Sequence, residues 1–329
     1  MKTDPRQVKR IVILRTDRIG EVLLSTPVIE ALRRKFPSAG ISFVTSAYAS
    51  DIVSDREDLT EVIDFDTISV NPCLCKTLAL AAKLRKRHFD MAIILNPHKL
   101  LHLSSFLAGI KCRVGYNRKW PFLLTHKVED KKREGLMHEV EYNLELLKII
   151  DVYEKNTRPF IPVLSKSVLS VDKLFQERGI TGTKRIVAIH PGSSNSDKRW
   201  PPEKFREVAK MLAESASVEV VLIGDDSEKP LCEEIGSGLR GVYNLAGSFT
   251  VKELAAFLKR VDLLITNDNG PMHIAAALGT KVVAIFNSDL KGSNPKRWGP
   301  YGEGHIVIYR PLDEIMAEEV VEAAEKIFK

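Results

Sequence analysis

Short apolar runs alternate with segments of helical period through both halves of the chain, and this alternation restricts the folds that it can adopt. Runs near 11–15, 91–95, 218–223 and 281–286 have the length of buried strands. Strands that alternate with helices form parallel sheets, because two parallel neighbours need a long crossover connection. The sequence therefore predicts an α/β protein built from doubly wound parallel sheets.

The predicted elements form one series in each half of the chain. In the first half, strands are expected near 11–15, 41–45, 61–65, 91–95 and 112–116, with helices near 22–36, 77–88, 101–109 and 138–150. In the second half, strands are expected near 186–190, 218–223, 242–245, 262–266 and 281–286, with helices near 203–215, 228–237, 251–260 and 271–278. The closing segment 313–328 has the pattern of a capped amphipathic helix.

A proline-containing stretch at 154–170 interrupts the alternation and marks a domain boundary. At 329 residues, the chain has the length of about two domains. We predict an N-terminal domain over 1–160 and a C-terminal domain over 161–312. Because ligands bind beyond the carboxyl ends of parallel strands, we expect two Rossmann-like domains that face one another across a ligand cleft.

Composition removes several protein classes. The chain has no run of 18 uncharged apolar residues, and the apolar run after its first ten residues is too short for a secretory signal. The four cysteines have neither disulfide nor zinc-ligand spacing, which fits a reducing compartment. We therefore expect a cytoplasmic protein without a zinc-type metal site.

Charge is distributed unevenly along the chain. Residues 1–160 hold 27 Lys and Arg against 20 Asp and Glu, whereas residues 161–329 hold 22 against 23. A basic half attracts an anionic partner, such as a phosphorylated glycan, a bilayer surface or nucleic acid. The same excess also fits a solvated surface.

The turn after the first predicted strand carries a carboxylate. The segment RTDRIGE at 15–21 lacks both the GxGxxG and the GxxxxGK[ST] patterns, so the usual marks of NAD-binding and P-loop proteins are missing. Glu21 follows Gly20 at the start of a helix, where it can serve as a general base for an acceptor hydroxyl. It can equally complement the helix dipole.

A second turn, after the strand that ends at His190, offers groups for a diphosphate. These groups belong to Gly192, Ser193, Ser194, Asn195 and Lys198. Backbone N–H groups and hydroxyls in such a turn bind phosphate oxygens, and a lysine adds a point charge. The alternative is a capped helix start with a surface lysine.

A third turn, NDNGPMH at 267–273, has a similar layout. Contacts with the same ligand are expected from Asn269, Gly270, Pro271, Met272 and His273. Asp268 is awkward beside a phosphate unless it positions Lys198, a ribose or a sugar hydroxyl, and the alternative is a helix N-cap. Two anion-binding turns in one domain indicate a ligand with extended negative charge.

Further side chains complete the expected site. Glu228 can accept from ribose hydroxyls and Phe249 can pack on a base, although turn and core roles fit them equally. The adjacent Asp225 and Asp226 leave metal assistance open as an alternative. Contacts with an anionic acceptor are expected from Arg18, Asn96, His98, Lys99 and Arg113.

Several segments together resemble glycosyltransferase family 9, the heptosyltransferases of lipopolysaccharide core assembly. The segments are RTDRIGEVLLSTPVIEALRRKFP, AGIKCRVGY, HEVEYNLELL, HPGSSNSDKRWPPEKF, NDNGPMHIAAALG and RWGPYG. Their order and spacing extend over nearly the whole chain. The resemblance implies a GT-B architecture in which the C-terminal domain holds a nucleotide sugar and the last helix, 313–329, returns to the N-terminal domain.

The resemblance also implies roles for individual residues. It makes Glu21 the acceptor base, and it assigns the sugar donor to Ser193, Ser194, Lys198, Asp268 and His273. The implied catalytic residues are Glu21, Lys198 and Asp268. Two features depart from the family pattern: many members carry Asp at the position of Glu21, and the segment after Phe286 is longer.

The implied reaction is inverting, metal-independent transfer of heptose from ADP-heptose to a lipopolysaccharide core or another lipid-linked glycan. No cofactor is implied beyond the nucleotide sugar, and peripheral contact with the cytoplasmic face of the inner membrane is expected. Alternatives within the family are another nucleotide sugar, such as a UDP-sugar, or a protein acceptor. A more distant alternative is a non-catalytic protein that binds nucleotide sugars or nucleic acid, and an aromatic content of 7% disfavours nucleic acid.

Overall fold

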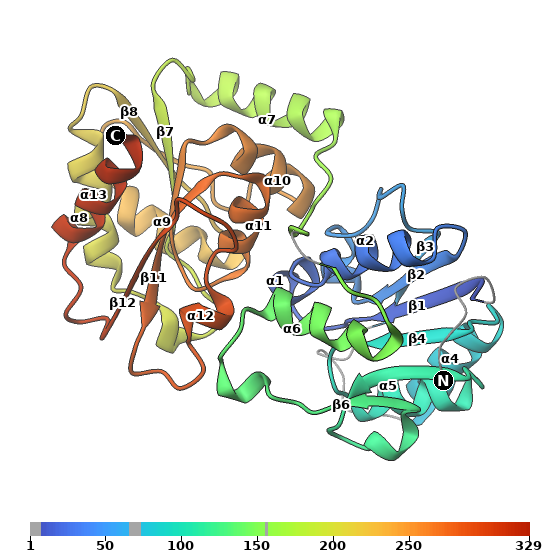
Figure 1. Ribbon diagram of the computed structural model, residues 1–329. Coiled ribbons are helices and arrows are strands. Elements are labelled where there is room, and N and C mark those ends of the chain that lie inside the picture. The colour runs from blue at the N-terminus through green and yellow to red at the C-terminus, as the bar shows by residue number, and fades with distance from the viewer. Residues whose placement is uncertain (1–7, 66–73, 155–156) are drawn as a thin grey trace. The chain divides into compact units, whose positions relative to one another are not determined.

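The computed structural model describes residues 8–65, 74–154 and 157–329, and it divides into two compact units (Figure 1). The first unit is Met1–Phe160 and the second is Ile161–Lys329. Each unit contains a six-stranded sheet in which all neighbouring strands are parallel, with helices packed on it. The predicted α/β fold with doubly wound parallel sheets is confirmed.

The first unit has the strand order β3-β2-β1-β4-β5-β6. Its strands are β1 (Arg10–Leu14), β2 (Gly40–Thr45), β3 (Glu61–Asp64), β4 (Met91–Ile94), β5 (Cys112–Tyr116) and β6 (His126–Val128). Its helices are α1 (Ile19–Leu23), α2 (Thr26–Lys35), α3 (Ala47–Ser50), α4 (Leu74–Arg85), α5 (Lys99–Leu107) and α6 (Glu139–Glu145), with 3-10 turns η1 (Pro121–Leu123), η2 (Lys132–Glu134) and η3 (Leu146–Ile150). Successive strands are added on one side of β1 up to β3 and on its other side from β4 onward. The carboxyl ends of β1 and β4 therefore border the crevice where such sheets bind ligands.

The second unit has the order β12-β11-β10-β7-β8-β9. When its strands are counted from β7, this is the same topology as that of the first unit. Its strands are β7 (Arg185–His190), β8 (Val218–Leu222), β9 (Val242–Asn244), β10 (Leu263–Asn267), β11 (Lys281–Asn287) and β12 (Ile306–Arg310). Its helices are α7 (Ser165–Arg178), α8 (Pro202–Ala213), α9 (Lys229–Gly236), α10 (Val251–Arg260), α11 (Gly270–Leu278), α12 (Pro295–Trp298) and α13 (Ala317–Phe328), with 3-10 turns η4 (Ser196–Lys198) and η5 (Asp226–Glu228). Here β7 and β10 are the neighbours at the point of reversal.

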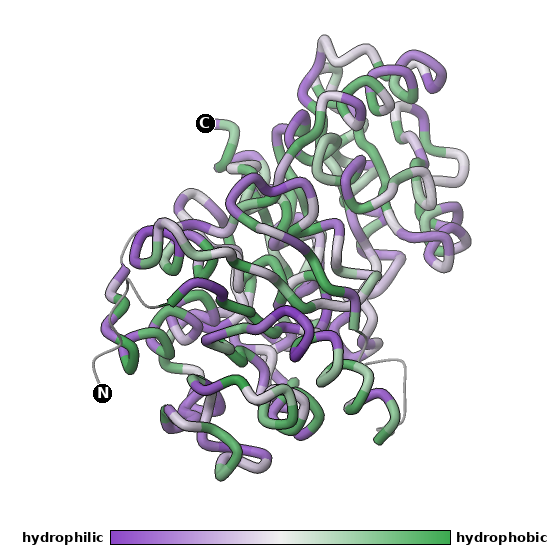
Figure 2. The backbone as a smooth tube through the Cα atoms, turned by 90° about the vertical axis from the view of Figure 1, so that its right-hand side faces the viewer, coloured by the Kyte–Doolittle hydropathy of each residue, from purple (hydrophilic) through white to green (hydrophobic). Residues whose placement is uncertain are grey.

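Both faces of each sheet are covered, which explains why the strands are apolar throughout. Ile11, Val12, Ile13 and Leu14 of β1 are completely buried, so side chains on both faces of this strand lie in a core. Val12 and Leu14 belong to a cluster that also contains residues of α4 and α5. Figure 2 shows the corresponding hydrophobic runs, in green, inside each unit.

Each strand predicted from the sequence is present, and the differences lie at the edges and ends of elements. The predicted helix at 22–36 is split into α1 and α2, because Pro27 lacks an N–H group and the hydroxyl of Thr26 donates instead to the carbonyl of Leu23 at 2.8 Å. The edge strands β6 and β12 and helix α7 were not predicted. These strands are largely half-exposed, so they lack the apolar run that marks a buried strand.

The structure corrects the expectation for the closing helix. Helix α13 packs against α8 and β11 within the second unit, where Val320 and Ala324 are buried in the core. The prediction that this helix returns to the N-terminal domain is therefore wrong. In the described ranges, none of the helices is both long enough and apolar enough to cross a bilayer.

Candidate functional site

The carboxyl ends of β7 and β10 bring two predicted ligand-binding turns together. The strands pair in parallel, with His190 opposite Thr266, so the turns that follow them leave the same edge of the sheet. The Nζ of Lys198 in the first turn lies 2.5 Å from Oδ2 of Asp268 in the second. The side-chain amide of Asn269 also donates to the carbonyl of Gly192 at 2.9 Å. These contacts make the two turns one site.

Asp268 is a buried carboxylate that holds Lys198 in place. Burial raises the pKa of Asp268, and the ammonium of Lys198 opposes this shift. The hydroxyl of Ser293, from the long segment after β11, donates to the same carboxylate oxygen at 3.4 Å. The lysine is thus held as a positioned cation at the carboxyl edge of the sheet, which is one of the roles that the sequence suggested for Asp268.

Gly192 is required by close packing. A Cβ atom at this position would lie 1.7 Å from Oε1 of Glu228, so any other residue would displace the turn or the carboxylate. Ser193 is buried, and its carbonyl accepts from Nε of Arg199 at 2.7 Å, whereas Ser194 is exposed. Of these two serines, Ser194 is therefore the one whose side chain is open to solvent.

Three residues that were predicted to contact the ligand have side chains that are engaged or buried within the protein. The side-chain oxygen of Asn195 caps η4 by accepting from the N–H of Asp197 at 3.1 Å. Asn269 ties the two turns together and caps α11 through the N–H of Met272 at 3.2 Å. Met272 is completely buried, so its side chain cannot contact a ligand at the edge of the sheet. We therefore treat Asn269 as a positioning residue.

A buried histidine, which the sequence did not single out, supports this site. Nδ1 of His190 lies 2.7 Å from the amide nitrogen of Asn269, and its Nε2 lies 3.2 Å from Oε2 of Glu228. Burial disfavours the Glu228 carboxylate, but the His190 hydrogen bond and the N–H of Asp225 outweigh it and lower the pKa of Glu228. Glu228 is therefore ionised and held beside Gly192, at the end of β8.

The start of α11 and the turn after β9 complete the carboxyl edge of the second sheet. Pro271 stands in the first turn of α11, and His273 is buried one turn into the helix. The first N–H groups of a helix attract anions. Phe249 is half-buried and its ring packs on Phe257 with centroids 4.9 Å apart. These positions can contact a phosphate and a flat base, respectively.

In the first unit, Glu21 lies in the first turn of α1, just beyond the carboxyl end of β1. Burial and the neighbouring Asp17 raise the pKa of Glu21, while Arg15 and Arg18 oppose the shift. Its proton affinity is thus higher than that of an ordinary exposed glutamate. A carboxylate of this kind is suited to removing a proton from a hydroxyl.

Arg15 beneath this turn is anchored by a buried ionic cluster. Its Nη1 lies 3.1 Å from Oε1 of Glu139, and the same oxygen accepts from Nζ of Lys132 at 2.6 Å. Burial disfavours the charge of Arg15, but Asp17, Glu139 and Glu21 together raise its pKa. No role was predicted for Glu139 or Lys132, and the only signal was the segment HEVEYNLELL that carries Glu139.

Most of the expected acceptor residues gather at the carboxyl end of β4. Asn96 donates to the hydroxyl of Thr16 at 3.4 Å, which links the turns after β1 and β4. His98 caps α5 by accepting from the N–H of Leu100 at 3.3 Å, and burial and Lys119 lower its pKa. Lys99 is exposed beside it. Arg18 is exposed in the turn after β1, the strand next to β4.

Arg113 does not belong to this group, and its predicted acceptor contact is corrected. It lies near the amino end of β5, opposite Ala92 of β4. Its guanidinium donates to the carbonyls of Leu123, at 2.6 Å, and Ile110, and it stacks on the ring of Phe106. The side chain therefore holds local structure together at the other end of the sheet.

Asp225 and Asp226, the pair that left metal assistance open, interact with neighbouring protein groups. Asp225 caps η5 by accepting from the N–H groups of Ser227 and Glu228, and Asp226 pairs with Lys229 at 2.6 Å. Among the described residues, no group of three His, Cys, Asp or Glu side chains comes together as a metal site.

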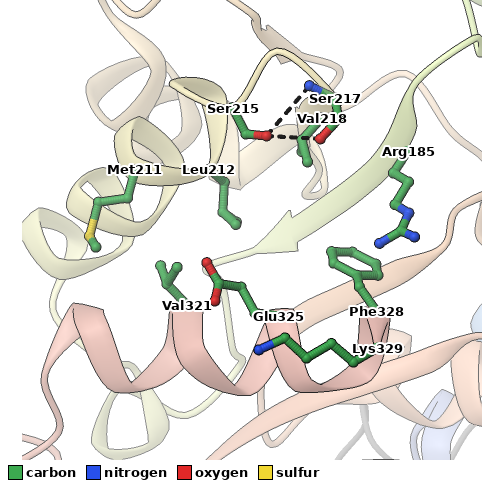
Figure 3. A pocket seen from close by; sticks show the side chains of 10 residues that line it. All are labelled: Arg185, Met211, Leu212, Ser215, Ser217, Val218, Val321, Glu325, Phe328 and Lys329. Carbon is green, nitrogen blue, oxygen red and sulfur yellow. Dashed lines mark hydrogen bonds between the residues drawn. The ribbon is translucent and has the colours of Figure 1, made fainter.

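A cavity of about 290 Å³ lies elsewhere in the second unit (Figure 3). It is lined by Arg185 and Val218, at the amino ends of β7 and β8, and by Phe328 near the end of α13. The amino ends of parallel strands lie opposite their carboxyl ends. This cavity is therefore separate from the site formed by the two turns.

Known proteins resemble this chain in sequence. The family described as "Glycosyltransferase family 9 (heptosyltransferase)" matches residues 77–326. Lipopolysaccharide heptosyltransferase 3 of Escherichia coli K12 is 26% identical over 340 aligned positions, covering 94% of this chain and 95% of that protein. Lipopolysaccharide heptosyltransferase 2 of the same organism is 25% identical over 287 positions, covering 84% and 82%.

Solved structures share the fold of this chain. A family 9 glycosyltransferase from Veillonella parvula superposes with a TM-score of 0.86 and 24% identity, covering 97% of each chain. The ADP-heptose lps heptosyltransferase II of E. coli superposes with a TM-score of 0.81 and 23% identity, covering 97% of this chain and 98% of that one. The chain therefore has the GT-B fold of these proteins and belongs to glycosyltransferase family 9, the heptosyltransferase family, as an enzyme that transfers a sugar.

Proposed function

We propose that this enzyme transfers a heptose from ADP-heptose to a lipopolysaccharide core or related lipid-linked glycan, with inversion at the anomeric carbon. The relatives named above are lipopolysaccharide heptosyltransferases, and one structural neighbour was solved with ADP. The observation that carries the proposal is the joining of Lys198, Asp268 and the Gly192 turn at the reversal point of the second sheet.

The second unit binds the donor in this proposal. Lys198, the turn at Ser193 and Ser194, and the start of α11 contact the diphosphate. Glu228, with Oε1 directed toward Gly192, accepts from the ribose, and Phe249 contacts the adenine. As the bond between the anomeric carbon and the diphosphate breaks, charge collects on the leaving oxygen. Fixed donors stabilise that charge because they need no reorganisation during the step.

The first unit supplies the base. The Glu21 carboxylate takes the proton of the acceptor hydroxyl, whose oxygen forms the new bond to the anomeric carbon on the side opposite the diphosphate. This requires Glu21 to reach the acceptor while the donor occupies the second unit. The raised pKa of Glu21 supports the role, because a base with greater proton affinity gains more from the transfer.

We propose that the positive groups at the two turns perform the neutralisation that some transferases obtain from a metal ion. The engagement of Asp225 and Asp226 in capping and ion pairing supports this view. The acceptor is an anionic glycan that meets Arg18, Asn96, His98 and Lys99 at the cytoplasmic face of the inner membrane. The basic excess of the first half of the chain supports an anionic acceptor.

The test of the base is the variant Glu21→Gln, which keeps the size of the side chain but removes its proton affinity. We expect kcat to fall by about 100- to 10,000-fold, while the Kd for ADP changes by no more than a few-fold. The matched control is Glu30→Gln, a change at an exposed position of α2. Retained turnover together with lost ADP binding would contradict the assignment.

The test of the donor is a comparison of nucleotides. Thermal shift with ADP, UDP and GDP should rank ADP first, because the proposal places an adenine at Phe249. A larger stabilisation by UDP would replace ADP-heptose by a UDP-sugar. The contact of Ser293 with Asp268 supports a role for the long segment after β11 in the choice of sugar.

A further inference from the structure

The outer surface of α4 and α5 in the first unit is unusually apolar. The two helices pack side by side on one face of the sheet (Figure 1). Toward the outside, α4 leaves Leu74 63% and Leu78 51% exposed, and α5 leaves Phe106 48% exposed and Leu107 partly exposed. Leu100 and Leu103 of α5 are half-buried on the same helix. Hydrophobic side chains gathered in this way mark a surface for a partner.

The turn that contains η1 adds two aromatic rings to this surface. Trp120 is 39% exposed and Phe122 is 73% exposed, with ring centroids 6.3 Å apart. Lys119 and Trp120 have left-handed backbones, with φ of 52° and 67°, a conformation that is costly for residues other than glycine. The turn thus keeps a strained backbone while it presents Trp120 to solvent.

Cation contacts hold this turn along the length of α5. Nζ of Lys99, at the start of α5, lies 5.2 Å from the centroid of the Trp120 ring. Near the end of α5, the guanidinium of Arg113 stacks on Phe106 and donates to the carbonyl of Leu123. Helices α4 and α5 and the turn at 118–123 therefore form one surface, which we call the aromatic-basic surface.

The segment that contains this surface is rich in basic residues. Between residues 67 and 128, the sequence has eleven Lys and Arg and a single carboxylate, Asp90. The cations are Lys76, Lys83, Arg85, Lys86, Arg87, Lys99, Lys111, Arg113, Arg118, Lys119 and Lys127. Asp90 is occupied, because it accepts from the backbone N–H groups of Lys9 and Arg10. Arg87 pairs with Glu61 and Arg118 pairs with Asp130. Among the described residues, Lys111, Lys119 and Lys127 form no ion pair with a carboxylate.

Exposed aromatic and aliphatic side chains in a segment rich in Lys and Arg match the chemistry of an anionic bilayer surface. Trp and Phe insert at the level of the headgroups, and each nearby Lys or Arg gains from the negative surface potential. Leucines such as Leu74 and Leu78 have no aromatic face for stacking on nucleic-acid bases. A second copy of the same surface would meet it with charge of the same sign.

We infer that the aromatic-basic surface docks the first unit on anionic phospholipid headgroups. The surface adjoins the edge of the sheet to which the acceptor is assigned, because Lys99, which contacts Trp120, follows His98 at the carboxyl end of β4. Docking here would bring that edge to an acceptor whose lipid is embedded in the bilayer. This last step rests on the proposed function, whereas the docking itself does not.

The experiment is flotation of the full chain with vesicles of phosphatidylcholine, with and without phosphatidylglycerol. The test variant is Lys76→Glu on α4 combined with Phe122→Ser, because both side chains are exposed on this surface and neither is assigned to the acceptor or donor site. The control is Lys166→Glu combined with Leu169→Ser on α7, where Leu169 is 68% exposed. It makes the same change in charge and polarity in the second unit.

We expect the natural chain to float with phosphatidylglycerol vesicles and to stay unbound with phosphatidylcholine alone. The test variant should lose at least about fivefold in partition coefficient, while the control keeps its binding. Equal binding by both variants, or equal binding to both kinds of vesicle, would overturn the proposal. If the natural chain does not bind vesicles but sediments as a dimer that the test variant disrupts, the surface binds a second copy of the chain instead.

Two further measurements separate this inference from the proposed function. Circular dichroism and the Kd for ADP should match between the test variant and the natural chain, because the changes lie outside the second unit. Failure of the natural chain to bind ADP counts against the donor assignment and leaves the flotation result interpretable. ADP binding without flotation counts against the docking surface alone.

Discussion

At the scale of single residues, this enzyme places its charged groups in pairs whose members come from distant parts of the chain. Lys198 and Asp268 are 70 residues apart and meet at 2.5 Å. Arg15 and Glu139 are 124 residues apart and meet at 3.1 Å. Each pair fixes a charge next to a turn that the sequence had already marked. Loss of Lys198 would leave the buried Asp268 carboxylate without its cation, which is costly, whereas Glu139 would keep Lys132 as a second partner.

The pair at the donor site leads to a prediction for Lys198→Ala. We expect kcat to fall by about 100- to 1,000-fold, because one preorganised positive group facing the leaving diphosphate is lost. Affinity for ADP should fall as well. Steady-state kinetics and calorimetric titration with ADP would measure both. Lys210→Ala on the exposed side of α8 serves as the control, and an unchanged rate in Lys198→Ala would make Lys198 a purely structural residue.

The environment of Glu21 leads to a prediction about pH. Turnover needs the ionised carboxylate, so kcat/KM should fall as the pH drops through the raised pKa of Glu21. The charge of Asp17 contributes to that rise, so Asp17→Asn should move the acidic limb of the pH profile to lower pH. The control Asp64→Asn, on an exposed residue of β3, should leave the limb in place. A shift to higher pH in Asp17→Asn would exclude Glu21 as the group that titrates.

At the scale of elements, the candidate site residues lie at strand ends and helix starts, and other helices stabilise the sheets that position them. The break between α1 and α2 shows how this works. A continuous helix was predicted there, but Pro27 interrupts the hydrogen bonding, and α1 is left as a short turn that presents Glu21. In the second unit, the unpredicted α7 is fixed to α10, because the hydroxyl of Ser170 donates to Glu253 at 2.6 Å.

The capping box of α10 gives a prediction for stability. The Thr250 hydroxyl accepts from the N–H of Glu253 at 3.3 Å, and the Glu253 carboxylate accepts from the N–H of Thr250 at 2.9 Å. We expect Thr250→Ala to lower the free energy of unfolding by about 1 kcal/mol, because an N–H at the helix start loses its partner. Urea unfolding would measure the change. Thr250→Ser keeps the acceptor oxygen and should be nearly neutral, and an equal loss in both variants would exclude the cap as the cause.

At the scale of the whole molecule, the two units repeat one strand order, and each holds its candidate site residues at the same topological position. In the first unit this is the carboxyl end of β1 and β4, and in the second it is the carboxyl end of β7 and β10. Each unit has its own core, as the clusters on each sheet show. A ligand held by one unit therefore acts first on the stability of that unit.

Hydrogen exchange with and without ADP tests this division. We expect the largest gains in amide protection at 192–198 and 270–273, because the diphosphate binds the backbone there. At a concentration 100 times its Kd, ADP should stabilise the folded state by about 2.7 kcal/mol. The matched comparison is the turn at 15–21, which follows β1 in the first unit. Larger protection at that turn than at 192–198 would place the nucleotide in the wrong unit for this proposal.

The sequence by itself determined the α/β class, the predicted strands and the turns that contain the candidate site residues. These depend on local properties: the period of apolar residues shows which segments are buried, and glycine with small polar residues shows where the chain turns. The turn with Gly192 and Lys198 and the turn with Asp268 were both identified in this way. Their family resemblance followed from the same residues.

Only the tertiary structure decided which of these residues meet. The neighbouring of β7 and β10 joins Lys198 to Asp268, while the position of Arg113 near the amino end of β5 removes it from the acceptor group. The tertiary structure also shows that α13 packs within the second unit and that Asn269 links the two turns. Such contacts depend on strand order and on packing between segments far apart in sequence. The energies of these contacts are not reflected in the local periodicity of apolar residues, so the sequence pattern does not predict them.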